Sequence, residues 1–252
     1  MHARVSFFRF YEELNDFLHE HKRKKTFPYH FSGTPSVKDA IEAIGVPHTE
    51  IDLILINGDS VDFTFRLQGG ERVAVYPVFE SLDVTPIQHL HPSPLRTTRF
   101  VLDVHLGTLC RLLRMLGFDS CYRNDLSDLE IISISIEQKR IILTRDQGIL
   151  KHSSVTHGYW IRSTDPQRQI EEVVRRFDLC TSFAPFTRCM RCNGELSARL
   201  PEEVKRLVPG HVVQTADRFM QCSRCQRVYW RGTHTISMEQ KIQRLRTLCQ
   251  KE

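Results

Sequence analysis

Hydrophobic residues recur at strand and helix spacings along most of the chain, and the pattern changes near its middle. In the first part, residues 5–10 and 26–31 have the composition of strands, and a helix is predicted after Ser36, a favoured N-cap residue. The apolar positions of this helix recur every three or four residues up to Gly45, a typical helix end. The first part is therefore predicted to be a small α+β domain.

A β-hairpin is predicted to follow this helix. Asn57 and Gly58 lie between two β-rich runs, and Asn-Gly favours a two-residue hairpin turn. Residues 72–79 supply a last strand. Two strands, a helix and further strands in this order indicate a β-grasp arrangement over residues 1–80.

The central part alternates strands with helices. Buried strands are predicted at 100–102, 118–122, 141–144 and 159–163. Repeated strand–helix units indicate a parallel sheet with helices on both faces. We expect this α/β domain to cover residues 99–180.

Acidic residues gather at one edge of the predicted parallel sheet. Asp103 and Asp146 end two of its strands, and Asp125, Asp128 and Glu130 lie between them at the start of a helix. The carboxyl ends of parallel strands meet at one edge, where ligands collect. Carboxylates that converge there offer the oxygen ligands that Mg²⁺ and Mn²⁺ prefer. The pattern favours a metal site for phosphodiester hydrolysis.

The composition indicates a globular protein that does not span a membrane. Of 252 residues, 40% are hydrophobic and 26% charged, as in globular proteins, and no apolar run approaches the roughly 20 residues that span a bilayer. Glu12 and Glu13 lie where a signal peptide would be apolar, so we expect a cytoplasmic protein without a membrane partner.

The net charge of +5 is concentrated in residues 186–252, which contain 13 Lys/Arg and 6 Asp/Glu. This indicates either a polyanionic partner or an ordinary solvated surface.

A proline-rich segment separates the first two domains. Residues 81–98 contain Pro86, Pro92 and Pro94 and show little periodicity. Proline restricts its own backbone and that of the preceding residue, which predicts an extended, semi-stiff linker. The two domains are therefore expected to share few contacts.

The last domain, predicted over residues 181–245, contains two Cys-x-x-Cys pairs: Cys189, Cys192, Cys222 and Cys225. Two such pairs bring four thiolates into a tetrahedron, the arrangement of a structural Zn²⁺ site. Disulfides or scattered buried thiols are the alternatives, and disulfides are rare in a reducing cytosol. The remaining cysteines show no such pairing and are interpreted as buried or incidental thiols: Cys110, Cys121, Cys180 and Cys249.

Arginines and aromatic residues are interleaved around the second Cys-x-x-Cys pair. Arg224 and Arg227 lie within and after it, and Tyr229 and Trp230 follow. This mixture suits single-stranded nucleic acid, whose bases stack on rings while its phosphates pair with cations. The alternative is that Tyr229 and Trp230 pack against the zinc site of a small domain.

Three stretches of the chain together resemble one known family. FVLDVHLGTLCRLLRMLGFD, LTRD and FTRCMRCNGEL…CSRCQRVYWRGTH resemble the RNase family named after the C-terminal domain of the Mut-seven exonucleases, a PIN-like nuclease branch with an added zinc ribbon. The resemblance covers about residues 98–240, and the preceding β-grasp segment is similar to the ubiquitin-like domain found fused to this family. It implies metal-dependent cleavage of RNA.

The β-grasp segment also resembles the ubiquitin-like sulfur carriers, through FYEELN, INGDSVDF and GGERVAVYPVF. Those carriers act through a free C-terminal Gly-Gly, whereas Gly69 and Gly70 are internal here, so sulfur transfer is not expected. The resemblance implies a binding or scaffolding role, with a protein partner.

The RNase resemblance assigns roles to the acidic residues. It makes Asp103 and Asp146 the core Mg²⁺ or Mn²⁺ ligands and Asp128 the third acid, with Asp125 as an alternative third or a fourth. Such carboxylates would hold ions that polarise a phosphate and activate a water. The alternative for Asp103, Asp128 and Asp146 is that they only stabilise helix N-termini.

The same resemblance gives three arginines RNA-binding roles. Arg145 would clamp the scissile phosphate, and Arg111 and Arg114 would hold the flanking backbone. Solvated surface charges are the alternative. Thr144 is expected to orient Asp146 or to close the turn.

Three functions fit these motifs. The first is a metal-dependent ribonuclease, the second a non-catalytic RNA-binding adaptor that uses the basic zinc ribbon, and the third a protein-interaction scaffold built on the β-grasp domain. Because Asp103, Asp128 and Asp146 are all present, we favour the enzyme. The motifs do not specify which RNA is cut, whether cleavage is internal or terminal, or the oligomeric state.

Overall fold

The computed structural model describes residues 3–77 and 98–250, so the predicted linker at 81–98 lies, apart from its last residue, outside the described residues. The described chain forms two compact units. The first combines the N-terminal part of the chain with residues 146–160, and the second contains residues 98–145 and 161–250.

The N-terminal part is built on a five-stranded sheet with the order β2-β1-β5-β3-β4. Its strands are β1 (Arg4–Phe10), β2 (Phe27–Phe31), β3 (Leu53–Ile56), β4 (Asp59–Ser60) and β5 (Arg72–Tyr76). β1 and β5 are parallel and all other neighbours are antiparallel. This mixed sheet confirms the β-grasp fold predicted from the sequence.

The local signals of the sequence explain this fold. The helix α1 (Val37–Ile44) begins with a capping box, in which Ser36 and Asp39 each accept the backbone N–H of the other. Asn57 and Gly58 have φ angles of 54° and 102°, the left-handed conformation that a two-residue hairpin requires. Three 3₁₀-helices complete the connections: η1 (Glu12–Phe17), η2 (Glu20–Lys22) and η3 (His48–Glu50).

The central sheet has the order β7-β6-β8-β9. Its strands are β6 (Arg99–Leu102), β7 (Asp119–Cys121), β8 (Ile141–Thr144) and β9 (Gly158–Trp160). β6 is parallel to both β7 and β8, with Leu102 beside Leu143. The carboxyl ends of these three strands therefore lie at one edge, as the alternating pattern predicts.

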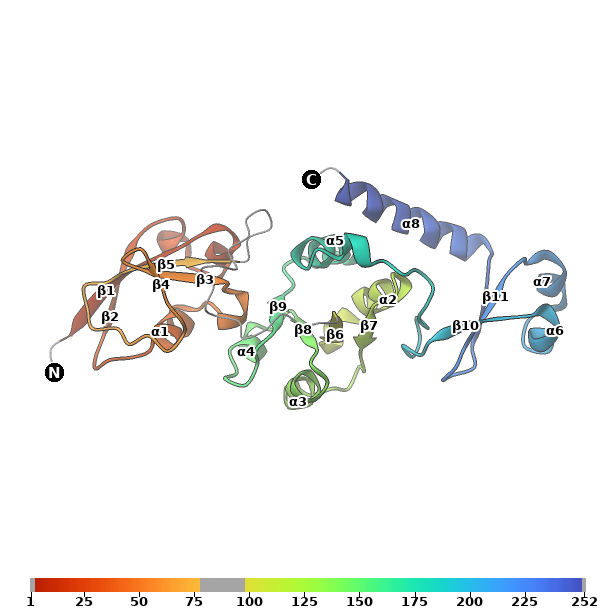
Figure 1. The fold of residues 1–252 in the computed structure, drawn as a ribbon, viewed down its shortest axis with the longest axis horizontal. Helices are drawn as coiled ribbons and strands as arrows, with labels where there is room; N and C mark the ends of the chain where they lie inside the picture. Colours follow the sequence, from red (N-terminus) through yellow and green to blue (C-terminus); the bar gives the residue numbers. More distant parts are fainter. Residues whose placement is uncertain (1–2, 78–97, 251–252) are drawn as a thin grey trace. The chain divides into compact units, whose positions relative to one another are not determined.

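Helices follow the strands of this sheet. They are η5 (Val104–Leu106), α2 (Gly107–Met115), α3 (Asp128–Gln138), α4 (Gln147–Leu150), α5 (Pro166–Arg176) and η6 (Leu179–Ser182). α2 packs with α5 on one face of the sheet, and α3 packs on the other, against β6 and β8 (Figure 1). The strand predicted at 159–163 is shorter, because Glu172 accepts the backbone N–H groups of Arg162 and Ser163.

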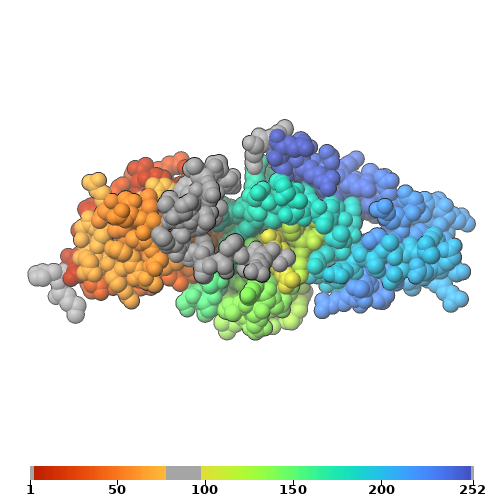
Figure 2. Space-filling model, viewed as in Figure 1, coloured from red at the N-terminus to blue at the C-terminus, as the bar shows by residue number. Residues whose placement is uncertain are grey.

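The C-terminal part is a small antiparallel sheet with the order β10-β11-β12. Its elements are β10 (Leu196–Arg199), α6 (Pro201–Val204), α7 (Gly210–Thr215), β11 (Phe219–Cys222), β12 (Val228–Trp230) and the long helix α8 (Thr233–Cys249). The segment between β10 and β11 lies at the surface of the second unit (Figure 2). It covers a small core of its own: Val204, Val208, Val212, Phe219 and Val228.

One interpretation of the cysteines is wrong. Cys180, in η6, and Cys249, at the end of α8, form a disulfide and are not incidental thiols. Their Cα atoms are 5.9 Å apart although 69 positions separate them in the sequence. α8 returns the chain end to η6, and no spacing rule for nearby cysteines detects such a pair. Cys110 and Cys121 are free thiols.

No helix among residues 3–77 and 98–250 is long and apolar enough to cross a membrane.

Candidate active site and zinc site

Asp103 directly follows β6 and is held by three donors. Its Oδ1 atom accepts the backbone N–H of His105 at 2.7 Å, and Oδ2 accepts the Thr144 hydroxyl at 2.8 Å and the Arg145 N–H at 3.1 Å. Only 6% of Asp103 is exposed. The bond to His105 caps η5, so Asp103 has the helix-capping geometry that was the alternative to a ligand role. Thr144 therefore orients Asp103, a partner that the sequence pattern did not indicate.

A hydrogen bond also joins the residues that follow β7 to the loop that begins at Asp103. Tyr122, which follows β7, donates its hydroxyl to the carbonyl of Val104 at 2.9 Å. A Cβ atom on Gly107 would come within 2.7 Å of this hydroxyl, so the tie requires glycine at that position. The residues after β6 and after β7 are therefore fixed to each other at the carboxyl edge of the sheet.

Asp146 and Arg145 follow β8 and are both exposed. Oδ1 of Asp146 accepts the backbone N–H of Gly148 at 2.7 Å, which caps α4. A single capping bond uses only one of the roughly four lone-pair sites of a carboxylate. The cap of Asp146 is therefore compatible with metal binding.

Asp125 and Asp128 differ in their surroundings. Arg123 binds Asp125 at 2.9 Å and Glu130 at 3.2 Å. The hydrogen bond from Arg123 lowers the pKa of Asp125, and backbone and hydroxyl bonds from Ser127 lower the pKa of Glu130. Asp128 is exposed at the first position of α3, and its carboxylate has no hydrogen bond or ion pair among the described residues.

The arginines predicted to bind RNA fall into two groups. Arg111, Arg145, Arg224 and Arg227 are exposed. Arg114 is only 4% exposed and donates to three backbone carbonyls, those of Ser120, Met190 and Arg191, at 2.7–3.2 Å. A guanidinium that is buried and bound in this way fixes the chain and offers no face to a phosphate.

The four predicted zinc ligands come together. Within the described parts of the chain, Cys189, Cys192, Cys222 and Cys225 form the one group of three or more possible ligands whose atoms all lie within 4.8 Å of one another. The carboxylates of the candidate active site are not in such a group. The Sγ atoms of Cys189 and Cys225 are 3.6 Å apart, and those of Cys192 and Cys222 are 3.4 Å apart. Zn–S bonds of about 2.3 Å in a tetrahedron give S···S distances of about 3.8 Å, so the thiols fit Zn²⁺.

The two Cys-x-x-Cys turns have the same backbone structure. In each, the N–H of the first cysteine binds the carbonyl five residues later, Gly194 in one and Arg227 in the other. The residue after each second cysteine, Asn193 or Gln226, has a positive φ. A Cβ atom on Gly194 would lie 2.8 Å from the Cys222 Sγ, so the first turn requires glycine there.

The surroundings of Cys189 and Cys192 shift their pKa values in opposite directions. Burial opposes the ionisation of Cys189, but the Tyr229 hydroxyl, at 3.1 Å from its sulfur, and backbone N–H groups outweigh burial and lower its pKa to about 6. Burial and the neighbouring thiols raise the pKa of Cys192 to about 12. An ion that takes these sulfurs as thiolates must displace protons, as structural zinc does.

The first cysteine turn is anchored on β7. Asn193 accepts the Ser120 N–H at 3.0 Å and donates to Asp119 at 2.7 Å, and Arg140 binds the same carboxylate oxygen at 2.7 Å. Burial opposes the ionisation of Asp119, but the bonds from Arg140 and Asn193 outweigh it and lower its pKa. Together with Arg114, this network joins the four-cysteine cluster to the α/β sheet. Of the residues in this network, the sequence motifs singled out Arg114 alone, and for RNA binding.

A parallel α/β domain with carboxylates at its strand ends is thus joined to a small antiparallel sheet whose four-cysteine cluster fits a metal ion. Residues 98–242 match the Mut7-C RNAse domain, and residues 3–83 match Mut7-C ubiquitin. The chain belongs to the Mut7-C RNase domain family and carries the Mut7-C ubiquitin-like domain at its N-terminal side. The family implies nuclease activity and an RNA substrate. Among the curated proteins and the solved structures, none matches this chain.

Proposed function

We propose that this chain is a metal-dependent ribonuclease that hydrolyses phosphodiester bonds of RNA at the carboxyl edge of its parallel sheet. The observation that carries the proposal is the fixed carboxylate of Asp103, buried and held by three donors at 2.7–3.1 Å. A capping role needs only one of these bonds. The other two fix the direction of the second carboxylate oxygen, as expected for a ligand whose position matters.

The acidic residues fit Mg²⁺ or Mn²⁺. Mg²⁺ is usually held by one or two protein carboxylates together with waters and substrate phosphates, so three carboxylates in mutual contact are not required. We assign Asp103 and Asp146 as ligands because they follow neighbouring parallel strands. Asp128 is the third acid in preference to Asp125, because Arg123 already neutralises Asp125. A bound ion would supply Lewis acidity that stabilises negative charge on the phosphate.

The basic residues have separate roles in this proposal. Arg145 lies beside Asp146, and its backbone is fixed by its bond to Asp103, so its side chain starts from a defined position near the phosphate. Arg111 on α2 and Arg224 and Arg227 at the second cysteine turn are exposed and would bind the RNA backbone. Arg114 has no RNA-binding role in this proposal, because its guanidinium donates to backbone carbonyls inside the protein.

Cleavage of a single-stranded RNA by the purified full chain tests this function. RNA labelled at its 5′ end is incubated with Mg²⁺, with Mn²⁺ or with neither, and an Asp146→Asn chain is assayed in parallel. We expect cleavage only with the divalent ions and only by the wild-type chain, and the fragment lengths will distinguish internal from terminal cleavage. RNA binding without any cleavage would support the adaptor function instead.

A further inference from the structure

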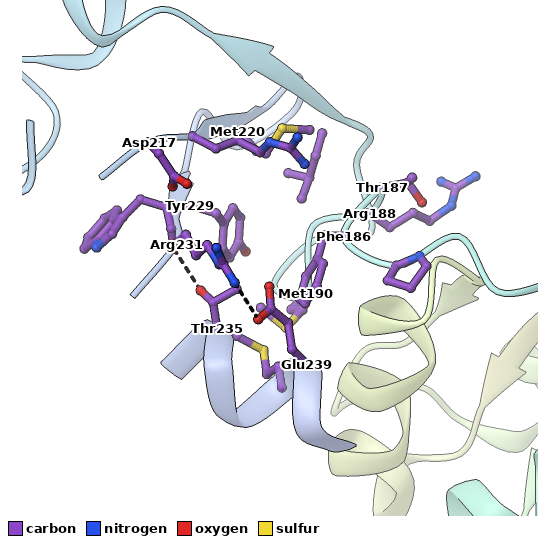
Figure 3. A pocket seen from close by; sticks show the side chains of 15 residues that line it. Phe186, Thr187, Arg188, Met190, Asp217, Met220, Tyr229, Arg231, Thr235 and Glu239 are labelled. Carbon is purple, nitrogen blue, oxygen red and sulfur yellow. Dashed lines mark hydrogen bonds and ion pairs between the residues drawn. The ribbon is translucent and has the colours of Figure 1, made fainter. Parts of the chain in front are cut away.

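A pocket of about 560 Å³ lies in the second unit, between the small antiparallel sheet, the segment around Phe186 and the first turns of α8 (Figure 3). No residue of the candidate active site lines it. Its size is in the range of pockets that hold small organic groups, roughly 300–1,000 Å³.

The floor of the pocket is made of rings and thioethers. Phe186, Tyr229, Met190, Met220 and Met238 line it, and all five are partly buried. The Tyr229 ring is held in place because its hydroxyl contacts the sulfur of Cys189 at 3.1 Å. A fixed aromatic face among polarizable thioethers favours a flat aromatic ligand.

Phe186 is held at this pocket by a strained backbone. Its φ is 60°, a conformation that costs a non-glycine residue about 1 kcal/mol or more. Its N–H binds the carbonyl of Met115, and the N–H of Ala184 binds that of Leu116, so the end of α2 enforces the conformation. The scaffold thus presents this ring to the pocket.

The charged groups at the edge of the pocket differ in their interactions. Arg231 is paired with Glu239 at 3.4 Å, and Arg188 points away from the pocket, toward the carbonyl of Asn193 (Figure 3). Among the described residues, the side chains of Asp217 and Arg218 have no hydrogen bond or ion pair, and both line the pocket. They offer one acceptor and one cationic donor beside an aromatic floor.

We propose that this pocket binds one unpaired base of the RNA substrate. The base would stack on the Tyr229 and Phe186 rings, Asp217 would accept from an amino or imino group on the base edge, and Arg218 would bind an adjacent phosphate. The positive charge of residues 186–252 complements such a ligand. The inference rests on the proposed ribonuclease function and adds to it a site for an unpaired nucleotide.

Binding to RNA that lacks one base tests the pocket directly. The full chain is titrated, without Mg²⁺ or Mn²⁺, with a single-stranded RNA of about ten nucleotides and with versions that are abasic at one position each. For the wild-type chain, one abasic position should lower the affinity about tenfold, the loss of one stacked base. Met238→Trp, which fills the pocket, should bind intact and abasic RNA equally. Trp230→Ala, which removes an aromatic ring from the pocket lining, should reduce the tenfold difference.

The matched control is Arg206→Ala, which removes a charge from the same domain outside the pocket. The Arg206→Ala chain should keep the tenfold difference in affinity between intact and abasic RNA. Arg218→Ala should weaken the binding of intact RNA more than Arg206→Ala does. The zinc content of each variant shows whether it is folded. If Met238→Trp loses zinc, Trp230→Ala keeps the test decisive, because Trp230 is 37% exposed and its removal should not disturb the fold.

Two results would overturn the inference while the chain still cleaves RNA. One is a wild-type chain that is insensitive to every abasic position, which would indicate another occupant such as a peptide side chain. The other is a tenfold difference that persists in folded Met238→Trp and Trp230→Ala chains. A wild-type chain that neither binds nor cleaves RNA would instead refute the proposed function itself.

Discussion

Thr144 donates its hydroxyl to Asp103 over 2.8 Å, and both side chains are buried. This bond joins β8 to the residue that ends β6, and it links two strands whose carboxyl ends carry the candidate active site.

Replacing Thr144 by valine keeps the shape of the side chain but removes this donor. A buried carboxylate that loses a hydrogen bond destabilises the fold by about 1–3 kcal/mol. We expect thermal unfolding to show this loss and RNA cleavage to slow about tenfold, because the carboxylate is no longer held in one direction. Thr144→Ser keeps the hydroxyl and should restore most of the rate. Equal rates for the valine and serine variants would contradict this role.

A second prediction concerns residues 146–160, which belong to the same compact unit as the N-terminal part. The buried carboxylate of Glu50 accepts the N–H of Trp160 at 2.6 Å, and His48 Nε2 lies 2.6 Å from the carbonyl of Val155. These bonds connect residues that the sequence assigned to two separate domains. Glu50→Ala, or a chain that begins at residue 98, should increase hydrogen exchange in residues 146–160 and slow cleavage.

The control for this prediction is Glu20→Ala, at an exposed position of η2. It removes the same group from the same unit and should change neither quantity. If the chain that begins at residue 98 cleaves RNA at the wild-type rate, the N-terminal part does not hold the segment that contains Asp146.

A third prediction concerns zinc. The full chain should contain about one zinc ion, and Cys192→Ser should lose it, because such ions supply folding energy. The loss should extend to β7, since the first cysteine turn holds Asn193 against Ser120. Elemental analysis and hydrogen exchange at Ser120 measure the two effects, with Cys121→Ser as the control. Full zinc content in the Cys192→Ser chain would contradict the four-cysteine site.

The disulfide between Cys180 and Cys249 gives a fourth prediction. It closes a loop of 69 residues, which stabilises the fold by about 4 kcal/mol through the entropy of the unfolded chain. Cys249→Ser or a reducing agent should lower the unfolding temperature of the second unit by roughly 10 °C, while zinc is retained. Thiol labelling of the unreduced chain at either cysteine would show that the pair is not bonded.

Local patterns predicted much of the fold. The Asn57–Gly58 turn, the helix N-cap at Ser36 and the strand at 141–144 are all present, since each depends on neighbours in the sequence. No helix was predicted in the C-terminal part. α8 has only two buried residues, Ile242 and Leu245, and so gives a weak apolar pattern.

The site was predicted in outline because strand ends are readable in the sequence. The carboxylates at Asp103 and Asp146 and the four cysteines follow from such local features. The hydrogen-bond partners of these residues do not follow from local features. Thr144 reaches Asp103 across 41 positions, Asn193 reaches Asp119 across 74, and Arg114 turns inward to Met190. Contacts of this kind depend on how distant elements pack, which no short motif specifies.

The most direct test of the account is a set of four Asp→Asn variants at saturating RNA with Mn²⁺. The single-turnover cleavage rate is measured together with the RNA affinity. Asp103→Asn, Asp128→Asn and Asp146→Asn should each lower the rate on the order of a hundredfold or more with little change in affinity, because each removes a ligand charge but no RNA contact. Asp125→Asn should stay close to wild type, because Asp125 is paired with Arg123. Wild-type cleavage by the Asp103→Asn and Asp146→Asn chains would contradict the proposed site.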